Sequence, residues 1–146
     1  MSASVSTEVR DLFDRYVRFL DDERYDEWLD LFADDGYYGV ITHRDYALDT
    51  NYVIVGERKS KLADRVRSGA RLDRHRRLHL LTAVTRSRAG PGPDATANFA
   101  LFRNGVPTFC GRYLAWLSEA GGGLRIRKWM VVLDNDPISE VVFLPI

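Results

Sequence analysis

The sequence is poor in the residues that hold metals, because Cys110 is the single cysteine among its 146 residues. One thiol excludes an intrachain disulfide, and by itself it cannot ligate an iron–sulfur cluster or build a structural zinc site. Histidine is also scarce. His79 is expected on a strand, His75 in the arginine-rich segment before it and His43 in a separate early segment. The sequence therefore predicts no metal site and no cofactor held by this chain alone.

Long apolar runs are missing as well. No stretch approaches the roughly 20 residues of a membrane-spanning helix, and the first seven residues lack the basic start and apolar run of a signal peptide. We therefore expect a cytoplasmic protein without a membrane partner. A hydrophobic content of 45% is typical of an ordered globular protein. At roughly 100–200 residues per domain, residues 1–146 form one domain.

The chain has no excess of charge of one sign, because 21 basic residues balance 21 acidic ones. This balance argues against a nucleic-acid-binding protein, which usually carries a basic excess. The charges are nevertheless separated along the chain. Segment 8–35 has a net charge of −7 and segment 58–77 a net charge of +7. Such segments are either solvated helix faces or contacts between subunits.

Apolar residues recur at spacings of three and four in the first half of the chain, which predicts amphipathic helices. Ser6 or Thr7 can cap the first helix. Gly36 and Gly69 can close the second and third, because glycine takes the left-handed conformation that ends helices. The predicted helices cover residues 5–20, 25–32 and 57–68. Short extended segments are expected over 37–42 and 52–55.

After residue 76 the apolar period changes to two, which is typical of strands. Asn104 and Gly105 predict a hairpin turn, and glycine-rich segments mark two further turns. The predicted strands cover 78–85, 95–102, 107–117 and 124–133, with a short last strand over 141–144. Helices followed by long hairpin-linked strands predict an α+β fold. We expect the helices to pack on a strongly curved, mainly antiparallel sheet and to leave a conical pocket.

Several motifs resemble the small (β) subunits of aromatic-ring-hydroxylating dioxygenases. An aromatic-x-x-Trp step at Tyr25 and Trp28 precedes the sequence LFADDGYY over 31–38. The other similar motifs are HLLTAV over 79–84, FCGR over 109–112 and IRKWMVVLD over 126–134. The resemblance covers nearly the whole chain in the same order. It implies membership of the NTF2-like (cystatin-like, SnoaL-like) superfamily and hence an NTF2-like cone.

The resemblance also implies a function in the catabolism of aromatic compounds. The chain would be a structural, non-catalytic small subunit, with no catalytic residues of its own. The large (α) subunit would hold the Rieske iron–sulfur cluster and the mononuclear non-haem iron, and this chain would form a trimer within a mixed hexamer. Segment 58–77 and the outer faces of the long strands are the expected contacts. The family pattern carries Asn, Arg and Asp where this chain has Ala83, Tyr113 and Ala115.

A stand-alone NTF2-like enzyme or a small-ligand-binding protein that uses the cone pocket is the alternative. Dehydratases similar to scytalone dehydratase, or SnoaL-like cyclases, would work inside the cone, and Tyr16, Tyr38, His43 and His79 are the residues that fit such a site. A ketosteroid isomerase-like mechanism is disfavoured, because Val40 occupies the position of its aspartate base. If these residues have no catalytic role, we expect Tyr16 to pack in the core. We then expect His79 to be a hydrogen-bonded histidine at a sheet edge or a subunit contact.

Overall fold

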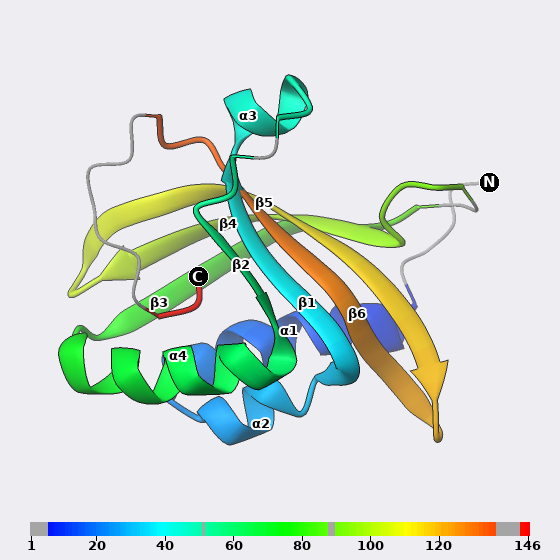
Figure 1. The fold of residues 1–146 in the computed structure, drawn as a ribbon, viewed down its shortest axis with the longest axis horizontal. Helices are drawn as coiled ribbons and strands as arrows, with labels where there is room; N and C mark the ends of the chain where they lie inside the picture. The colour runs from blue at the N-terminus through cyan, green and yellow to red at the C-terminus, as the bar shows by residue number, and fades with distance from the viewer. Residues whose placement is uncertain (1–5, 51, 88–89, 137–143) are drawn as a thin grey trace.

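The computed structural model describes residues 6–50, 52–87, 90–136 and 144–146. These residues form a six-stranded sheet in the order β2-β1-β6-β5-β4-β3, and helices cover one of its faces (Figure 1). The helices are α1 (Thr7–Asp21), α2 (Tyr25–Leu29), α3 (His43–Ala47) and α4 (Lys59–Leu72). The strands are β1 (Phe32–Thr42), β2 (Val55–Arg58), β3 (Arg77–Arg86), β4 (Ala95–Arg103), β5 (Val106–Ala120) and β6 (Gly123–Leu133).

The sheet is mixed but mainly antiparallel. Only β1 and β6 run parallel among the strand pairs that the described residues form. Register shifts interrupt the β1–β6, β3–β4, β4–β5 and β5–β6 pairs, and such irregularities bend strands. The sheet accordingly curves over α1 and α4 (Figure 1). The predicted α+β fold, with helices on a curved and mainly antiparallel sheet, is confirmed.

The first predicted helix is confirmed as α1, which begins at Thr7. The Ser6 side chain accepts a hydrogen bond from the Val9 N–H group and so caps the first turn. The apolar stripe of α1 faces the sheet and is buried; its members are Val9, Leu12, Phe13, Tyr16 and Leu20. The stripe positions the Tyr16 side chain inside the cone. None of the helices in the described part of the chain is long and apolar enough to cross a membrane.

The predicted second helix is too long, because α2 ends at Leu29 and Phe32 begins β1. The Leu31 carbonyl accepts a hydrogen bond from the Ile126 N–H group, and Phe32 pairs with Ile126. Pairing with β6 thus replaces the helix after Leu29. Gly36 does not close a helix either. It lies in the irregular part of β1, between the register of Phe32 and that of Tyr37.

Two further boundaries differ from the prediction, and one helix was not predicted. α4 continues to Leu72, so Gly69 lies buried inside the helix instead of ending it. The extended segment expected over 52–55 appears as β2, which begins only at Val55. The short helix α3 was not predicted; Thr42 caps it by accepting a hydrogen bond from the Asp45 N–H group. Of the last strand expected over 141–144, only Leu144 belongs to the described residues, and it is not in a strand.

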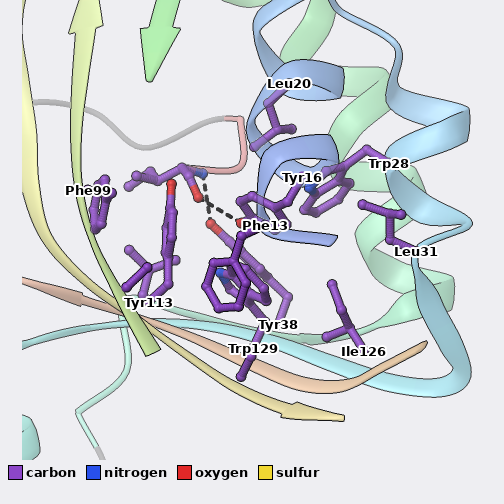
Figure 2. Close-up of a cluster of buried hydrophobic side chains, with 14 of the residues drawn as sticks. Phe13, Tyr16, Leu20, Trp28, Leu31, Tyr38, Phe99, Tyr113, Ile126 and Trp129 are labelled. Atoms are coloured by element: carbon purple, nitrogen blue, oxygen red, sulfur yellow. Dashed lines mark hydrogen bonds between the residues drawn. The ribbon is translucent and has the colours of Figure 1, made fainter. Parts of the chain in front are cut away.

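Aromatic side chains fill the space between the helices and the sheet, where the conical pocket was expected (Figure 2). The Tyr16 ring stacks on Trp129 at a centroid distance of 3.9 Å, and the Phe99 ring stacks on Tyr113 at 4.2 Å. Trp28 meets Tyr16 edge-on from α2. The concave side of the sheet is therefore a packed aromatic core. A second and smaller apolar cluster lies on the other face; its members are Ile41, Leu114, Met130 and Val132.

Candidate functional site

The segment 144–146 enters the cone and binds two of the candidate tyrosines. The Tyr16 hydroxyl donates a hydrogen bond of 2.8 Å to the Ile146 carbonyl, and the Ile146 N–H group donates one of 2.8 Å to the Tyr38 hydroxyl oxygen (Figure 2). All three residues are almost fully buried. The structure thus brings Tyr16 and Tyr38 together, as the alternative reading requires, but both hydroxyls are engaged by the chain itself.

Burial also restricts what these tyrosines can do chemically. Burial raises the pKa of Tyr16 well above its ordinary value, and the neighbouring Tyr38 and Tyr113 raise it further. Burial raises the pKa of Tyr38 in the same way, although the hydrogen bond from Ile146 opposes the shift. Neither phenol therefore ionises near neutral pH, so each acts as a neutral hydrogen-bonding group and not as a base.

Asp21 and the buried His79 form a pair that no sequence motif predicted. His79 Nδ1 lies 2.5 Å from Asp21 Oδ1, and Asp21 Oδ2 accepts a hydrogen bond of 3.1 Å from the His79 N–H group. His79 Nε2 is buried and has no hydrogen-bond partner among the described residues. A carboxylate on Nδ1 fixes the orientation of an imidazole and leaves Nε2 available, as in acid–base dyads. The same pair also fastens the end of α1 to the edge strand β3.

The other histidines lie elsewhere. His43 is exposed on α3. Figure 1 shows that α3 projects from the sheet at the end of β1. Tyr16 and Tyr38, by contrast, are buried in the core. His75 binds the carboxylate of Asp73. No group of three or more His, Cys, Asp and Glu side chains is positioned to hold a metal ion within the part of the chain that the structure describes. The absence of a metal site stays a prediction of the sequence.

An ionic cluster centred on Asp73 is buried next to the segment 144–146. Asp73 is only 2% exposed, and its carboxylate accepts hydrogen bonds from Arg77 at 2.9 Å and Arg103 at 2.6 Å. Arg77 also donates a hydrogen bond of 3.2 Å to the Pro145 carbonyl. The cluster therefore joins α4, β3, β4 and the segment 144–146. At least this part of the basic segment 58–77 stabilises the fold and is not a free contact surface.

A cleft of about 700 Å³ lies on the opposite, outer face of the sheet, away from the cone. Its apolar floor includes Tyr37, Trp116 and Met130. The Lys128 ammonium lies 4.6 Å from the centre of the Trp116 ring, a cation–π contact. The charged side chains at the rim are mostly basic. The basic residues are Arg58, Arg127 and Lys128, and the acidic residue is Asp35. We call this feature the outer cleft. The sequence did not predict it, because its lining comes from four separate segments.

Comparisons with known proteins agree with this fold and with one family. Residues 15–140 match the family described as "Ring hydroxylating beta subunit". A search of curated proteins returned no match. The structure is similar to a chain from Novosphingobium aromaticivorans assigned as the beta subunit of an aromatic-ring-hydroxylating dioxygenase, with 25% identity and a TM-score of 0.82. That match covers 96% of this chain and 95% of the other.

Two further solved structures share the fold. The beta subunit of benzoate 1,2-dioxygenase from Burkholderia mallei is 22% identical, with a TM-score of 0.73, and the match covers 99% of this chain and 100% of that subunit. A chain from Novosphingobium aromaticivorans assigned as a scytalone dehydratase is 12% identical, with a TM-score of 0.67 and coverage of 94% and 89%. The same cone therefore occurs in dioxygenase subunits and among dehydratases.

Proposed function

Because the chain belongs to the ring hydroxylating beta subunit family, we propose that it is the structural, non-catalytic small subunit of a cytoplasmic multicomponent aromatic-ring-hydroxylating dioxygenase. The observation that carries this proposal is the filled cone. Tyr16 and Tyr38, the groups that would meet a substrate there, bind the backbone of Ile146 instead. A chain whose interior is packed in this way is better suited to a structural role than to binding a substrate inside the cone.

The residues of this chain do not fit either iron centre of a ring hydroxylase. A Rieske cluster needs two cysteines and two histidines, and the chain has Cys110 alone. A mononuclear non-haem iron needs two histidines and a carboxylate on one face. Here His43, His75 and His79 lie on α3, before β3 and within β3 respectively. Both iron centres are therefore assigned to the large subunit, and this chain contributes no step of the reaction.

The proposed assembly is a mixed hexamer in which three copies of this chain support three large subunits. Its purpose would be to hold the large subunits in register, so that electrons cross between neighbours. Arg77 is unavailable as a contact because it is buried on Asp73. The proposed contact is therefore narrowed from the whole segment 58–77 to exposed basic residues within it: Lys61, Arg71, Arg74 and Arg76.

The alternative is a stand-alone acid–base enzyme, and the Asp21–His79 pair is the observation that favours it. The pair has the arrangement of a base with an orienting carboxylate, and the buried His79 Nε2 has no hydrogen-bond partner among the described residues. A substrate would have to displace the segment 144–146 from Tyr16 and Tyr38. The small-subunit role needs no such displacement, and for this reason we prefer it.

Purification of the chain with and without its large subunit tests the proposed function. This chain carries the affinity tag. When it is expressed alone, it should bind no iron and show no visible absorption. Co-expressed with the large subunit, it should carry that subunit through purification, and the complex should contain iron and oxidise an aromatic substrate. Elemental analysis, absorption spectra and product assays are the measurements. The Cys110→Ser variant is the control and should leave the iron content of the complex unchanged.

Stoichiometric iron in the chain alone, or turnover of any substrate by it, would contradict the proposal. So would the absence of the large subunit from the tagged material, since a structural subunit must bind what it supports.

A further inference from the structure

A short protrusion extends from the sheet where β1 ends, and it is unusually apolar. Figure 1 shows α3 projecting beyond the sheet, away from α1 and α4. Nine large apolar side chains are exposed among the described residues, and five of them lie here: Tyr46, Leu48, Tyr52, Val53 and Ile54. We call these five residues the apolar arm. Leu48 is 65% exposed and Tyr52 is 76% exposed. Exposed apolar side chains gathered in one place mark an interaction site in most soluble proteins.

The outer cleft adjoins the apolar arm, because Val53 belongs to the arm and also lines the cleft. The floor of the cleft offers Tyr37, Trp116 and Met130, side chains of the kind that receive an apolar anchor at the centre of a protein interface. Its volume of about 700 Å³ leaves room for more than one such side chain. Each copy of the chain therefore presents an apolar projection and an apolar recess side by side.

The charges around the arm and around the outer cleft are complementary. The charged side chains of residues 43–50 are Arg44, Asp45 and Asp49, which leaves one net negative charge, and Asp49 is exposed next to Leu48 without an ion pair among the described residues. The rim of the cleft has an excess of positive charge. Opposite charges on two facing surfaces steer association and fix its register. A second copy of this chain thus supplies both the shape and the charge that each surface lacks.

We propose that the apolar arm of one copy inserts Tyr46 and Leu48 into the outer cleft of a second copy. This inference rests on the proposed small-subunit role and deepens it, since it names the contact between copies within the trimer. In a trimer each copy would give its arm to the next copy and receive the arm of the previous one, and such a head-to-tail contact yields a closed ring when its rotation permits. The cone stays outside the contact, because the outer cleft is on the other face of the sheet.

The Leu48→Ser variant of the full chain, expressed without the large subunit, is the first test. Leu48 is exposed, so its replacement should leave the fold intact. We expect the wild-type chain to sediment as a trimer at micromolar concentration and the variant to self-associate about tenfold more weakly or worse. Val106→Ser is the matched control, because Val106 is also an exposed apolar residue but lies at the start of β5. Its sedimentation should equal that of the wild type.

A charge exchange provides the second test. Asp49→Lys and Lys128→Glu should each weaken self-association, and the double variant should recover much of it, because the exchanged charges again face each other across the contact. A monomeric wild-type chain would overturn the inference, as would a Leu48→Ser variant that still forms trimers. Co-expression of the Leu48→Ser variant with the large subunit separates the two partners: a variant that still forms trimers but no longer binds the large subunit would overturn the inference and assign the arm to that subunit. The proposed function does not depend on these outcomes, because its test is the iron content and the capture of the large subunit.

Discussion

Replacing Asp73 by asparagine should lower the free energy of unfolding by about 3–5 kcal/mol, because it removes the charge that compensates two buried guanidinium groups. The side chains of Arg77 and Arg103 are 5% and 11% exposed, and both bind the same carboxylate oxygen. For Arg77, the more deeply buried of the two, loss of the carboxylate charge inside the protein costs far more than loss of a partner at the surface. Urea unfolding followed by tryptophan fluorescence measures the loss.

Asp64→Asn is the matched control for this prediction. Asp64 pairs with Arg67 at 3.8 Å, but both side chains are largely exposed, so the loss should be within about 1 kcal/mol. A similarly small loss for Asp73→Asn would mean that the cluster does not stabilise the fold.

The same carboxylate makes stability depend on pH. Burial by itself would raise the pKa of Asp73, but hydrogen bonds from Arg103 and His75 outweigh it and hold that pKa below its usual range. A group whose pKa is lowered by folding stabilises the native state above its unfolded pKa, about 3.9 for aspartate. This stabilisation is lost as the pH falls from about 4 toward the lowered pKa. The wild-type chain should therefore lose stability more steeply than Asp73→Asn in that range.

Cutting Ile146 back to alanine should cost about 2–5 kcal/mol of unfolding free energy, since its side chain is buried in the core. Ile146→Val, which removes one methyl group, should cost about 0.5–1.5 kcal/mol. Tyr38→Phe should cost about 1–3 kcal/mol, because it leaves the buried Ile146 N–H group without its acceptor. The three variants are compared by urea unfolding. A negligible cost for Ile146→Ala would show that the segment 144–146 does not occupy the cone.

The fold was predictable from the sequence where the apolar pattern was long. The stripe of α1 and the alternation along β3 to β6 each extend over several turns or residue pairs, so the period was unambiguous. The boundary between α2 and β1 was not predictable in this way, because Phe32 fits the spacing of the helix as well as that of the strand. Only the pairing of Phe32 with Ile126 places it in the strand. α3 was missed because five residues are too few to establish a period.

The candidate site was predictable only in part, for reasons of distance along the chain. Motif resemblance selected Tyr16 and Tyr38, which do lie together. Asp21 gave no signal, because it is one of many acids in its segment and its partner His79 lies 58 residues away. The contact between Tyr16 and Ile146 spans 130 residues, and no local pattern encodes it. The filling of the cone, on which the proposed function depends, thus emerges only from the tertiary structure.

The turnover rate of the reconstituted oxygenase, measured with Tyr16→Phe and His79→Gln variants of this chain at matched assembly, tests the central claim most directly. A structural subunit predicts rates close to the wild type for both variants, because neither side chain would touch a reacting atom. An acid–base residue predicts a loss of about 10²–10⁴-fold while the complex stays assembled. Near-normal rates would support the small-subunit role, and a hundredfold loss in a fully assembled complex would contradict it.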